Sequence, residues 1–498
     1  MRPGLLWRDG DLDLVALPPA RPALVADLGL ERLYATMARE DPFVLEAVST
    51  IVPAPLISPE AVRYRQAVVR DVIAGPAAAR DLYRIATHAV ETERTTWGAG
   101  LRSPELAMRR SVGVLSALLD DLRALRSIVE RDGPAWTSEG LTSFAATVRA
   151  AIDDGFLARA AELLTSPDAR TVIASARIGE GNRGVDYVLR RTPDGTRRLR
   201  DRVAARARSG LVVDVTLRDQ NALNALGELR AQALASTGAA VADATAQVLG
   251  FFRRLRLELA FMVGCVNLHE TLDGRGVSTC LPVLAGASEQ AFEALDLVDA
   301  GLALATTGRL VGNDVHADGR GLVVVTGANG GGKSTLLRAV GLAQVMLGAG
   351  MFVAARELRA APRANVLTHF TREEEAGLDA GRLEAELRRL SALIDDARPA
   401  SLVLLNESLS STNERDGSVI AAEVVTALAD AGATVWYVTH LHELARSIEA
   451  MGRADTLFLR AERGAGGERP FRLVEAPPLE TSFGRDVYER VVRGSGAT

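Results

Sequence analysis

The sequence has almost no lysine or cysteine and few aromatic residues. Of its 58 lysines and arginines, only Lys333 is a lysine, and aromatic residues make up 4% of the 498 positions. The two cysteines, Cys265 and Cys280, are too few for a disulfide framework or a cysteine-based zinc site, which favours a reducing, cytoplasmic setting. The formal net charge of −5 excludes a generally basic chain, so contact with nucleic acid would need a local patch.

The sequence shows no pattern of a targeting or membrane-spanning segment. The first residues, MRPGLLWRDGDLDLV, carry acidic side chains early and have no apolar core, unlike a signal peptide. The longest apolar run, residues 339–355, is interrupted by Gln344 and is shorter than the ~20 residues that a bilayer requires. We therefore expect this run to be a buried helix leading into a strand, with no membrane as a partner.

What the sequence does contain is a phosphate-binding loop in GLVVVTGANGGGKST, residues 321–335. An apolar β-branched run precedes the loop and a helix-compatible segment follows it, as the G-x-x-x-x-G-K-[ST] motif requires. Glycines let backbone N–H groups turn towards a polyphosphate, and the helix N-terminus adds its positive dipole end. Lys333 would reach the β- and γ-phosphates, and the Ser334 hydroxyl would bind Mg²⁺. The predicted nucleotide-binding residues are Gly327, Ala328, Asn329, Gly330, Gly331, Gly332, Lys333, Ser334 and Thr335.

A second buried strand, SLVLL at residues 401–405, ends in Asn406 and Glu407. In P-loop ATPases, an apolar strand ending in an acidic pair places a Mg²⁺-organising carboxylate and a residue that positions or activates water. Here the first position, Asn406, is neutral and would act on Mg²⁺ through water. Glu407 is the candidate general base.

A third buried strand, TVWYV at residues 434–438, is followed by Thr439 and His440. A histidine at the tip of a core strand beside the nucleotide could sense or position the γ-phosphate. The alternative is a metal site formed by His440, His442 and Glu443. That site would need more ligands than the scattered histidines and two cysteines supply.

The chain before the phosphate loop is predicted to be mainly helical. The segment SPEAVRYRQAVVRDVI has the start signals of a helix: Ser58 as N-cap, then Pro59 and Glu60. Helical spacing of leucines and valines predicts another helix over residues 104–131, and residues 221–272 form a long region with few breakers.

Residues 169–214 break this pattern with two short predicted strands, 171–177 and 185–190, and an arginine cluster. Nine arginines against three aspartates give residues 183–208 a net charge of +6 in an otherwise acidic chain. One interpretation is contact with DNA phosphates, which needs charge but no base reading. The other is a solvated surface hairpin. The candidate DNA contacts are Arg190, Arg191, Arg197, Arg198, Arg200 and Arg202.

Taken together, these segments resemble the MutS superfamily of DNA mismatch-repair ATPases. TGANGGGKST is similar to the family's T-G-P-N-x-G-G-K-S-T, with Ala328 in place of proline, and SLVLLNESLSSTNERDG is similar to S-L-V-L-x-D-E-x-x-x-G-T-S-x-x-D-G. ATVWYVTHLHEL matches a strand followed by T-H-x-x-E-L, and TSFG at residues 481–484 resembles the family's S-[YF]-G stretch. The resemblance is strong over residues 320–490 and loose over residues 25–320.

The resemblance implies an α/β P-loop ATPase domain of the ABC/MutS type at the C-terminus, preceded by a mainly α-helical core and lever region. It also implies a homodimer that binds ATP and Mg²⁺ and encloses DNA between its levers. Carried over by position, Glu407 would polarise the attacking water and His440 would contact the γ-phosphate. Ser411, Thr412 and Asp416 would lie towards the partner subunit. The expected divisions are residues 1–110, a lever region 111–275 with the insert 169–214, and the ATPase domain 276–498.

The sequence also departs from the family pattern. The family reads mismatches with a Phe-x-Glu wedge, and no Phe-x-Glu occurs in this chain, so mismatch reading of that kind is not expected. Asn406 replaces the metal-organising aspartate, which predicts weaker metal binding and slower turnover. Gly381 aligns with a serine that reaches across the dimer, and Leu310 with an aromatic residue that stacks on adenine.

Three functions are consistent with these features. The first is a DNA-binding ATPase of the MutS type that acts in repair or recombination. The second is a protein that binds ATP but hydrolyses it poorly because of Asn406, and serves as a nucleotide-gated scaffold. The third, an ABC-type motor, would need an L-S-G-G-Q-like stretch before residue 401, and residues 376–400 contain none.

Overall fold

The computed structural model describes residues 2–8, 22–96, 104–165, 174–178, 184–189, 220–286, 289–308, 310–371, 381–463 and 469–478. The chain forms two compact units that are interleaved along the sequence. Unit 1 is Met1–Pro3, Asp81–Ala135 and Phe144–Arg256, and unit 2 is Gly4–Arg80, Trp136–Ser143 and Leu257–Thr498. The three consecutive divisions expected from the sequence remain a prediction.

Unit 2 is built on a six-stranded sheet. Its strands, in spatial order, are β12 (Leu473–Glu475), β11 (Thr456–Ala461), β6 (Leu322–Thr326), β10 (Thr434–Val438), β9 (Leu402–Asn406) and β8 (Val366–Phe370). All neighbours are parallel except β11 and β12. Every residue of β6, β8 and β10 is buried, as expected of parallel strands that are covered on both faces. The three predicted strands at residues 322–325, 401–405 and 434–438 are therefore present, with small shifts at their ends.

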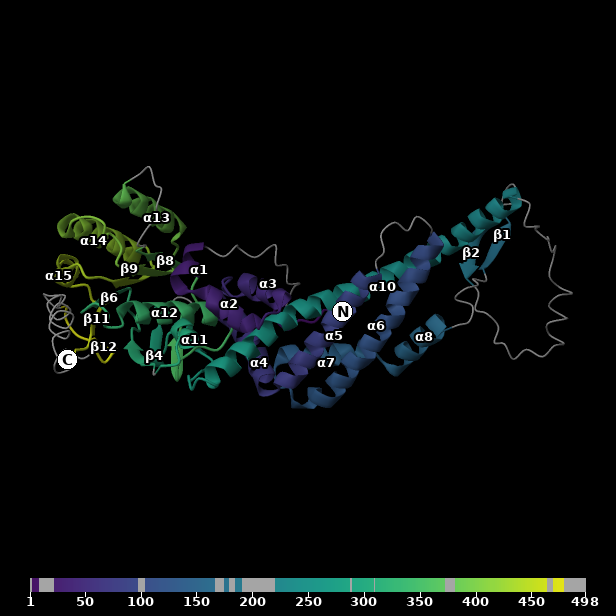
Figure 1. Ribbon diagram of the computed structural model, residues 1–498, viewed down its shortest axis with the longest axis horizontal. Helices are drawn as coiled ribbons and strands as arrows, with labels where there is room; N and C mark the ends of the chain where they lie inside the picture. The colour runs from purple at the N-terminus through teal and green to yellow at the C-terminus, as the bar shows by residue number, and fades with distance from the viewer. Residues whose placement is uncertain are drawn as a thin grey trace, which may run out of the picture. The chain divides into compact units, whose positions relative to one another are not determined.

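Helices cover both faces of this sheet (Figure 1). On one face, α13 (Arg382–Asp396), α14 (Glu414–Asp430) and α15 (His442–Ala450) pack their apolar side chains against β6, β8, β9 and β10 in one hydrophobic core. On the other, α12 (Lys333–Gly348) contacts β8, β9 and β10 as well as β4 of a second sheet. Because α12 is enclosed by two sheets, nearly all its residues are buried, which explains why its sequence is apolar on all sides.

The second sheet of unit 2 has four strands, in the order β3 (Val283–Leu284), β7 (Glu357–Ala360), β4 (Phe292–Leu297) and β5 (Asn313–His316). The short helix α11 (Ala300–Ala305) lies between β4 and β5 in sequence, and the Asp299 side chain caps it by accepting a hydrogen bond from Leu302 N. The expected helix-to-strand run at residues 339–355 becomes α12 followed by Val353, which pairs with Cys280. Among the described helices, none is both long and apolar enough to cross a bilayer.

Four N-terminal helices also belong to unit 2. They are α1 (Pro22–Leu28), α2 (Leu30–Ala38), α3 (Pro42–Ile51) and α4 (Pro59–Ala74). The predicted cap of α4 is confirmed, since Ser58 Oγ accepts a hydrogen bond from Ala61 N at 3.4 Å. Helix α1 contacts β8 and α12, so this N-terminal segment packs directly against the six-stranded sheet and its central helix.

Unit 1 is mainly helical. Its residues come from α5 (Pro76–Thr96), α6 (Pro104–Asp132), the 3₁₀ turn η2 (Gly133–Ala135), α7 (Glu139–Ala151), α8 (Asp154–Thr165) and α10 (Gln220–Asp273), together with the antiparallel pair β1 (Ala174–Ile178) and β2 (Gly184–Leu189). α5, α7 and α10 continue along the chain into unit 2. The predicted helices 104–131 and 221–272 correspond to α6 and α10, and the two predicted short strands to β1 and β2.

Candidate nucleotide site

The glycine loop of residues 327–332 connects β6 to α12 at the carboxyl edge of the six-stranded sheet. Gly327, Gly330 and Gly332 have φ angles of 117°, 70° and 94°, a region that side chains with a Cβ rarely enter. The loop is also packed closely against β11, because a Cβ on Gly327 or Gly331 would lie 2.8 Å from the Cβ of Ala461. The sequence pattern therefore matches a backbone shape that requires glycine at several positions.

Lys333 begins α12 and points back into this loop. Its side chain is 4% exposed, and its Nζ donates to Gly327 O at 2.7 Å and to Ala328 O and Asn329 Oδ1 at 3.3 Å each. Burial lowers the pKa of the Lys333 ammonium, an effect that the Glu407 carboxylate opposes. The ammonium is thus held by neutral oxygen acceptors in a loop shaped to receive an anion.

Ser334 and Asn406 bring two oxygen atoms together next to the loop. Ser334 Oγ donates to Asn406 Oδ1 at 2.8 Å, which joins the start of α12 to the end of β9. Thr371, after β8, donates through Oγ1 to the backbone carbonyls of Asn406 and Glu407 at 3.2 and 2.6 Å. These are hard oxygen atoms of the kind that Mg²⁺ accepts, although neither side chain carries a negative charge. The described residues contain no group of three or more His, Cys, Asp or Glu side chains placed to hold a metal ion.

Glu407 and His440 lie at the ends of neighbouring parallel strands, β9 and β10. Their side chains approach to 3.9 Å between Glu407 Oε2 and His440 Nδ1, and both are about one-third exposed. Glu407 has a φ of 55°, and its N–H donates to Val438 O at 2.8 Å. A non-glycine residue in this conformation stores backbone strain, which functional sites tolerate when their surroundings hold it in place.

The segment after Glu407 is held by three neighbouring elements. Ser408 Oγ donates to His369 O at 3.0 Å, and the Tyr437 hydroxyl donates to Ser408 O. On α13, the buried carboxylate of Glu386 accepts hydrogen bonds from Leu409 N at 2.6 Å and from Ser411 Oγ. The backbone that carries Glu407 is therefore fixed on both sides.

The residues predicted to face a partner subunit lie between the end of β9 and the first turn of α14. Thr412 is half-buried, and Asp416 is exposed in the first turn of α14. The Asn413 side chain caps this helix, accepting from Asp416 N at 2.9 Å and donating to Asp416 Oδ2 at 2.6 Å. Ser411 is engaged by Glu386 of its own chain.

Sequence reasoning missed a segment that lies against the glycine loop, residues 469–473 before and into β12. The Gly332 backbone approaches Phe471 so closely that an added Cβ would lie 3.3 Å from Phe471 O, and a Cβ on Gly330 would collide with Arg469 Nη1. Asn313 at the start of β5 ties the segment down: it donates to Phe471 O at 3.3 Å and accepts from Leu473 N at 2.8 Å. This segment follows Lys333 by more than 130 residues and carries no motif that would have identified it.

Several residues singled out from the sequence lie outside the described residues or away from the glycine loop. The six candidate DNA-binding arginines and the TSFG segment lie outside the described residues. Gly381 is the N-cap of α13, and Leu310 lies shortly before β5. Cys265 and Cys280 are free, as expected, and His269 packs edge-on against Phe352 with 5.2 Å between ring centroids.

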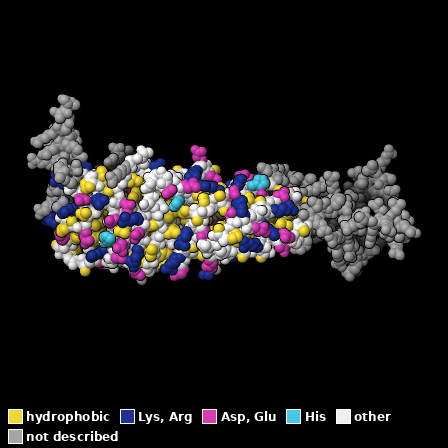
Figure 2. Space-filling view, turned by 90° about the horizontal axis from the view of Figure 1, so that it is seen from below, with side chains coloured by type: hydrophobic (Ala, Val, Ile, Leu, Met, Phe, Trp, Pro, Cys, Tyr) yellow, Lys and Arg dark blue, Asp and Glu magenta, His cyan; other side chains and the backbone are white. Residues whose placement is uncertain are grey.

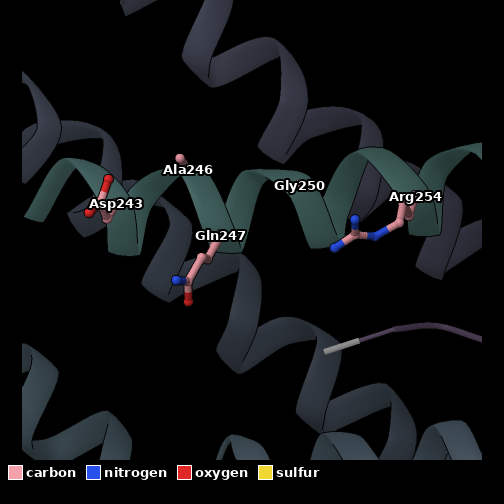
Figure 3. A pocket seen from close by; sticks show the side chains of 5 residues that line it. All are labelled: Asp243, Ala246, Gln247, Gly250 and Arg254. Carbon is pink, nitrogen blue, oxygen red and sulfur yellow. The ribbon is translucent and has the colours of Figure 1, made fainter. Parts of the chain in front are cut away.

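A hollow in unit 1 is unrelated to this site. It is lined by five residues of one face of α10, namely Asp243, Ala246, Gln247, Gly250 and Arg254 (Figure 3). All come from a single helix at helical spacing, and the hollow is open. It contains no cluster of catalytic groups.

Comparison with known proteins gives matches in both parts of the chain. A family model described as MutS2 N-terminal domain matches residues 57–275, and one described as MutS domain V matches residues 323–492. "Endonuclease MutS2" of Anaeromyxobacter sp. (strain Fw109-5) is 31% identical over 240 residues, which are 47% of this chain and 29% of that protein. "DNA mismatch repair protein MutS 2" of Halobacterium salinarum is 35% identical over 173 residues, 34% of this chain and 20% of that protein. The matched segments thus span less than a third of the length of these relatives.

Proposed function

Because the chain belongs to the MutS superfamily, we propose that it is a DNA-binding ATPase that acts in DNA repair or recombination. In this proposal, a homodimer couples ATP binding and hydrolysis to movement of its helical lever on DNA. The observation that carries the proposal is the meeting of Lys333, Ser334, Glu407 and His440 at one edge of the six-stranded sheet. The names of two relatives refer to DNA mismatch repair, and these names support the proposed binding to DNA.

The loop residues supply the binding of the polyphosphate. Backbone N–H groups of the glycine loop and the N-terminus of α12 face the phosphates, and the Lys333 ammonium exchanges its carbonyl partners for phosphate oxygens. A lysine suits this position since its compact charge fits among backbone groups, whereas a planar guanidinium would not.

Ser334 and Asn406 are the residues that would hold Mg²⁺, Ser334 directly and Asn406 through water. Bound Mg²⁺ supplies positive charge at the β- and γ-phosphate oxygens. Glu407 accepts a hydrogen bond from the attacking water and draws its proton away, while His440 contacts the γ-phosphate from the neighbouring strand. The strained, doubly anchored backbone at Glu407 keeps the carboxylate oriented for this role.

The dimer part of the proposal assigns Ser411, Thr412 and Asp416 to the partner-facing surface. Asp416 supports this assignment, as its carboxylate is exposed at the N-terminal end of α14 and accepts a hydrogen bond from the Asn413 side chain of the same turn. A second subunit could approach this turn without uncovering any core residue of α14.

The proposed binding to DNA is supported by the arginine-rich insert, whose local positive charge contrasts with the net charge of −5 of the whole chain. On the face drawn in Figure 2, acidic and basic side chains of the described residues are interspersed, with no broad patch of one sign. The insert carries a net +6 over residues 183–208. Phosphate contacts from such a cluster would be independent of sequence and sensitive to salt.

The ATPase proposal is tested by steady-state hydrolysis of ATP by the purified protein with and without Mg²⁺. Glu407→Gln keeps the shape of the side chain and removes its charge, so we expect hydrolysis to fall by about 100-fold or more while ATP still binds. Glu423→Gln, at an exposed position further along the neighbouring α14, is the matched control. Equal hydrolysis by wild type and Glu407→Gln would exclude Glu407 as the base.

A second function, the nucleotide-gated scaffold, is favoured by one observation. The residue that hydrogen-bonds Ser334 is an amide, Asn406, so the metal-organising position lacks a negative charge. Asn406→Asp restores that charge, and if the charge limits turnover we expect hydrolysis to rise about tenfold. A wild type that binds ATP, hydrolyses none of it and changes its DNA or protein binding in response would establish the scaffold instead.

DNA binding is tested with duplex, mismatched, branched and single-stranded DNA, each with and without ATP. Replacing Arg197, Arg198, Arg200 and Arg202 together by glutamine should weaken binding and flatten its dependence on salt concentration. An unchanged slope would mean that these arginines are surface residues without a role in DNA binding.

A further inference from the structure

Arg469 lies directly on the phosphate loop, although it is far from the loop in sequence. A Cβ built on Gly330 would collide with Arg469 Nη1 and would lie 3.5 Å from Arg469 Cζ, so the guanidinium rests against the Gly330 backbone. Gly330 is exposed and Arg469 is half-buried, so the guanidinium sits on the open side of the loop, where a ligand can reach it.

Arg469 has no hydrogen-bond or ion-pair partner among the residues that the structure describes. Half-burial of a guanidinium without an anion is unfavourable, since the group loses water without gaining a compensating contact. The positive charge of Arg469 also acts on the other cation of the loop. Burial lowers the pKa of Lys333, the Glu407 carboxylate raises it, and Arg469 lowers it further. Two cations therefore lie close together with one carboxylate nearby, an arrangement that a ligand with several negative charges would neutralise.

The backbone that follows Arg469, residues 471–473, is held in place. β12 pairs with β11 through Leu473 and Ala461, and Glu462 N donates to Arg472 O at 2.8 Å. The neighbouring Phe471 has a φ of 58°, and its carbonyl accepts from Asn313 at 3.3 Å. A side chain carried by a fixed backbone loses less freedom on binding, so more of its contact energy appears as affinity.

From this geometry we propose that Arg469 is a second cation of the nucleotide site, which binds the terminal phosphates of ATP together with Lys333. The proposal rests on the ATPase function above and deepens it by naming a residue that distinguishes ATP from ADP. The loop lysine of this motif reaches the β- and γ-phosphates. Arg469 rests on Gly330, and the side chain of the adjacent Asn329 accepts a hydrogen bond from Lys333 Nζ, so the guanidinium faces the same end of the nucleotide. A planar guanidinium can donate two parallel hydrogen bonds to phosphate oxygens.

The alternative is that Arg469 only packs on Gly330 and supports the shape of the loop. The two roles predict different effects on the affinities for ATP, which has a γ-phosphate, and for ADP, which lacks it. A support for the loop would affect ATP and ADP alike, whereas a contact to the terminal phosphates affects ATP more.

The test is calorimetric titration of the full-length protein with Mg-ATP and with Mg-ADP. The variants are Arg469→Gln, Arg469→Lys and, as a matched control, Arg472→Gln, which removes the same charge from an exposed side chain of the same hairpin. We expect Arg469→Gln to weaken ATP binding at least about tenfold and ADP binding much less, with Arg469→Lys between it and wild type. Arg472→Gln should bind both nucleotides like wild type, and circular dichroism should show all variants folded.

Unchanged ATP affinity in Arg469→Gln, or equal losses for ATP and ADP, would overturn the proposal. So would the same effect in Arg472→Gln, which would indicate a general loss of charge. A wild type that binds no nucleotide would overturn both this inference and the proposed function. A wild type that binds ATP while Arg469→Gln binds it equally well would overturn this inference alone.

Discussion

Two of the buried cations of unit 2, Lys333 at the sheet edge and Arg65 on α4, have surroundings that differ in kind. Their exposures are 4% and 0%. The Lys333 ammonium faces oxygen acceptors of a glycine loop whose middle residues, Asn329 and Gly330, are exposed. The Arg65 guanidinium lies over the Trp7 ring at 4.3 Å and near the Phe261 ring at 5.5 Å, and donates to Leu6 O at 3.4 Å and to Ala349 O at 3.0 Å.

The comparison shows that burial alone does not mark a functional cation. Burial lowers the pKa of Arg65 to about 9, and it also lowers the pKa of Lys333. The two cations differ in whether a ligand can reach them. Arg65 is enclosed by aromatic rings and links the N-terminal segment to the end of α12 through hydrogen bonds. Lys333 borders a loop that is open to a ligand. Arg65 should therefore matter for stability and Lys333 for nucleotide binding.

The largest expected effect is that of Lys333→Ala on ATP binding. Loss of charged contacts to two phosphates, at about 2 kcal/mol each, corresponds to roughly 1000-fold weaker binding. The thermal unfolding temperature should change little, because the buried ammonium costs desolvation energy that its carbonyl contacts only offset. Titration calorimetry and thermal unfolding measure the two quantities, and retained ATP binding would refute the assignment of Lys333.

Arg65→Ala should show the opposite behaviour. The substitution leaves a cavity between Trp7 and Phe261 and two buried carbonyls without their donor, at a cost of about 3 kcal/mol in the free energy of unfolding. Arg63→Ala, two residues earlier on the exposed side of α4, is the control and should cost little. Chemical denaturation checks both, and the comparison above fails if Arg65→Ala is as stable as wild type.

The smallest expected effect concerns His369, a buried base at the edge of the site. Burial lowers the pKa of His369, Arg389 lowers it further, and Glu386 opposes the shift. The unfolded chain therefore binds a proton at a higher pH than the folded one, so stability is lost as the pH falls below about 6.5, by up to about 1.4 kcal/mol per pH unit. His369→Gln should remove this part of the pH dependence in denaturation curves, while His316→Gln, at an exposed histidine, should not. Identical curves for His369→Gln and wild type would show that another group is responsible.

Local patterns predicted much of the fold. The strands at residues 322–325, 401–405 and 434–438, the loop before Lys333 and the cap at Ser58 all follow from nearest neighbours in the chain, and each is present. The meeting of Glu407 and His440 depends in addition on the pairing of β9 with β10, because neighbouring parallel strands bring their carboxyl ends to one edge of a sheet. The roles assigned to these residues stay predictions until the experiments above are done.

Long-range packing accounts for what the sequence did not predict. Ser411 Oγ donates to Glu386, which is 25 residues away on α13, and the acceptor could not be identified from the motif around Ser411. Arg65, in a helix with ordinary amphipathic spacing, is fully buried because α12 and α10 close over it.

By itself, the sequence determined where a phosphate loop forms, since glycines with positive φ and a lysine at a helix start are requirements of local backbone geometry. Only the tertiary structure decided which distant side chains meet that loop. β12 pairs with β11, and this pairing brings Arg469 onto Gly330, although no periodicity or motif connects the two residues. The physical reason is that contacts between distant segments depend on how sheets and helices pack, which no short stretch of sequence specifies.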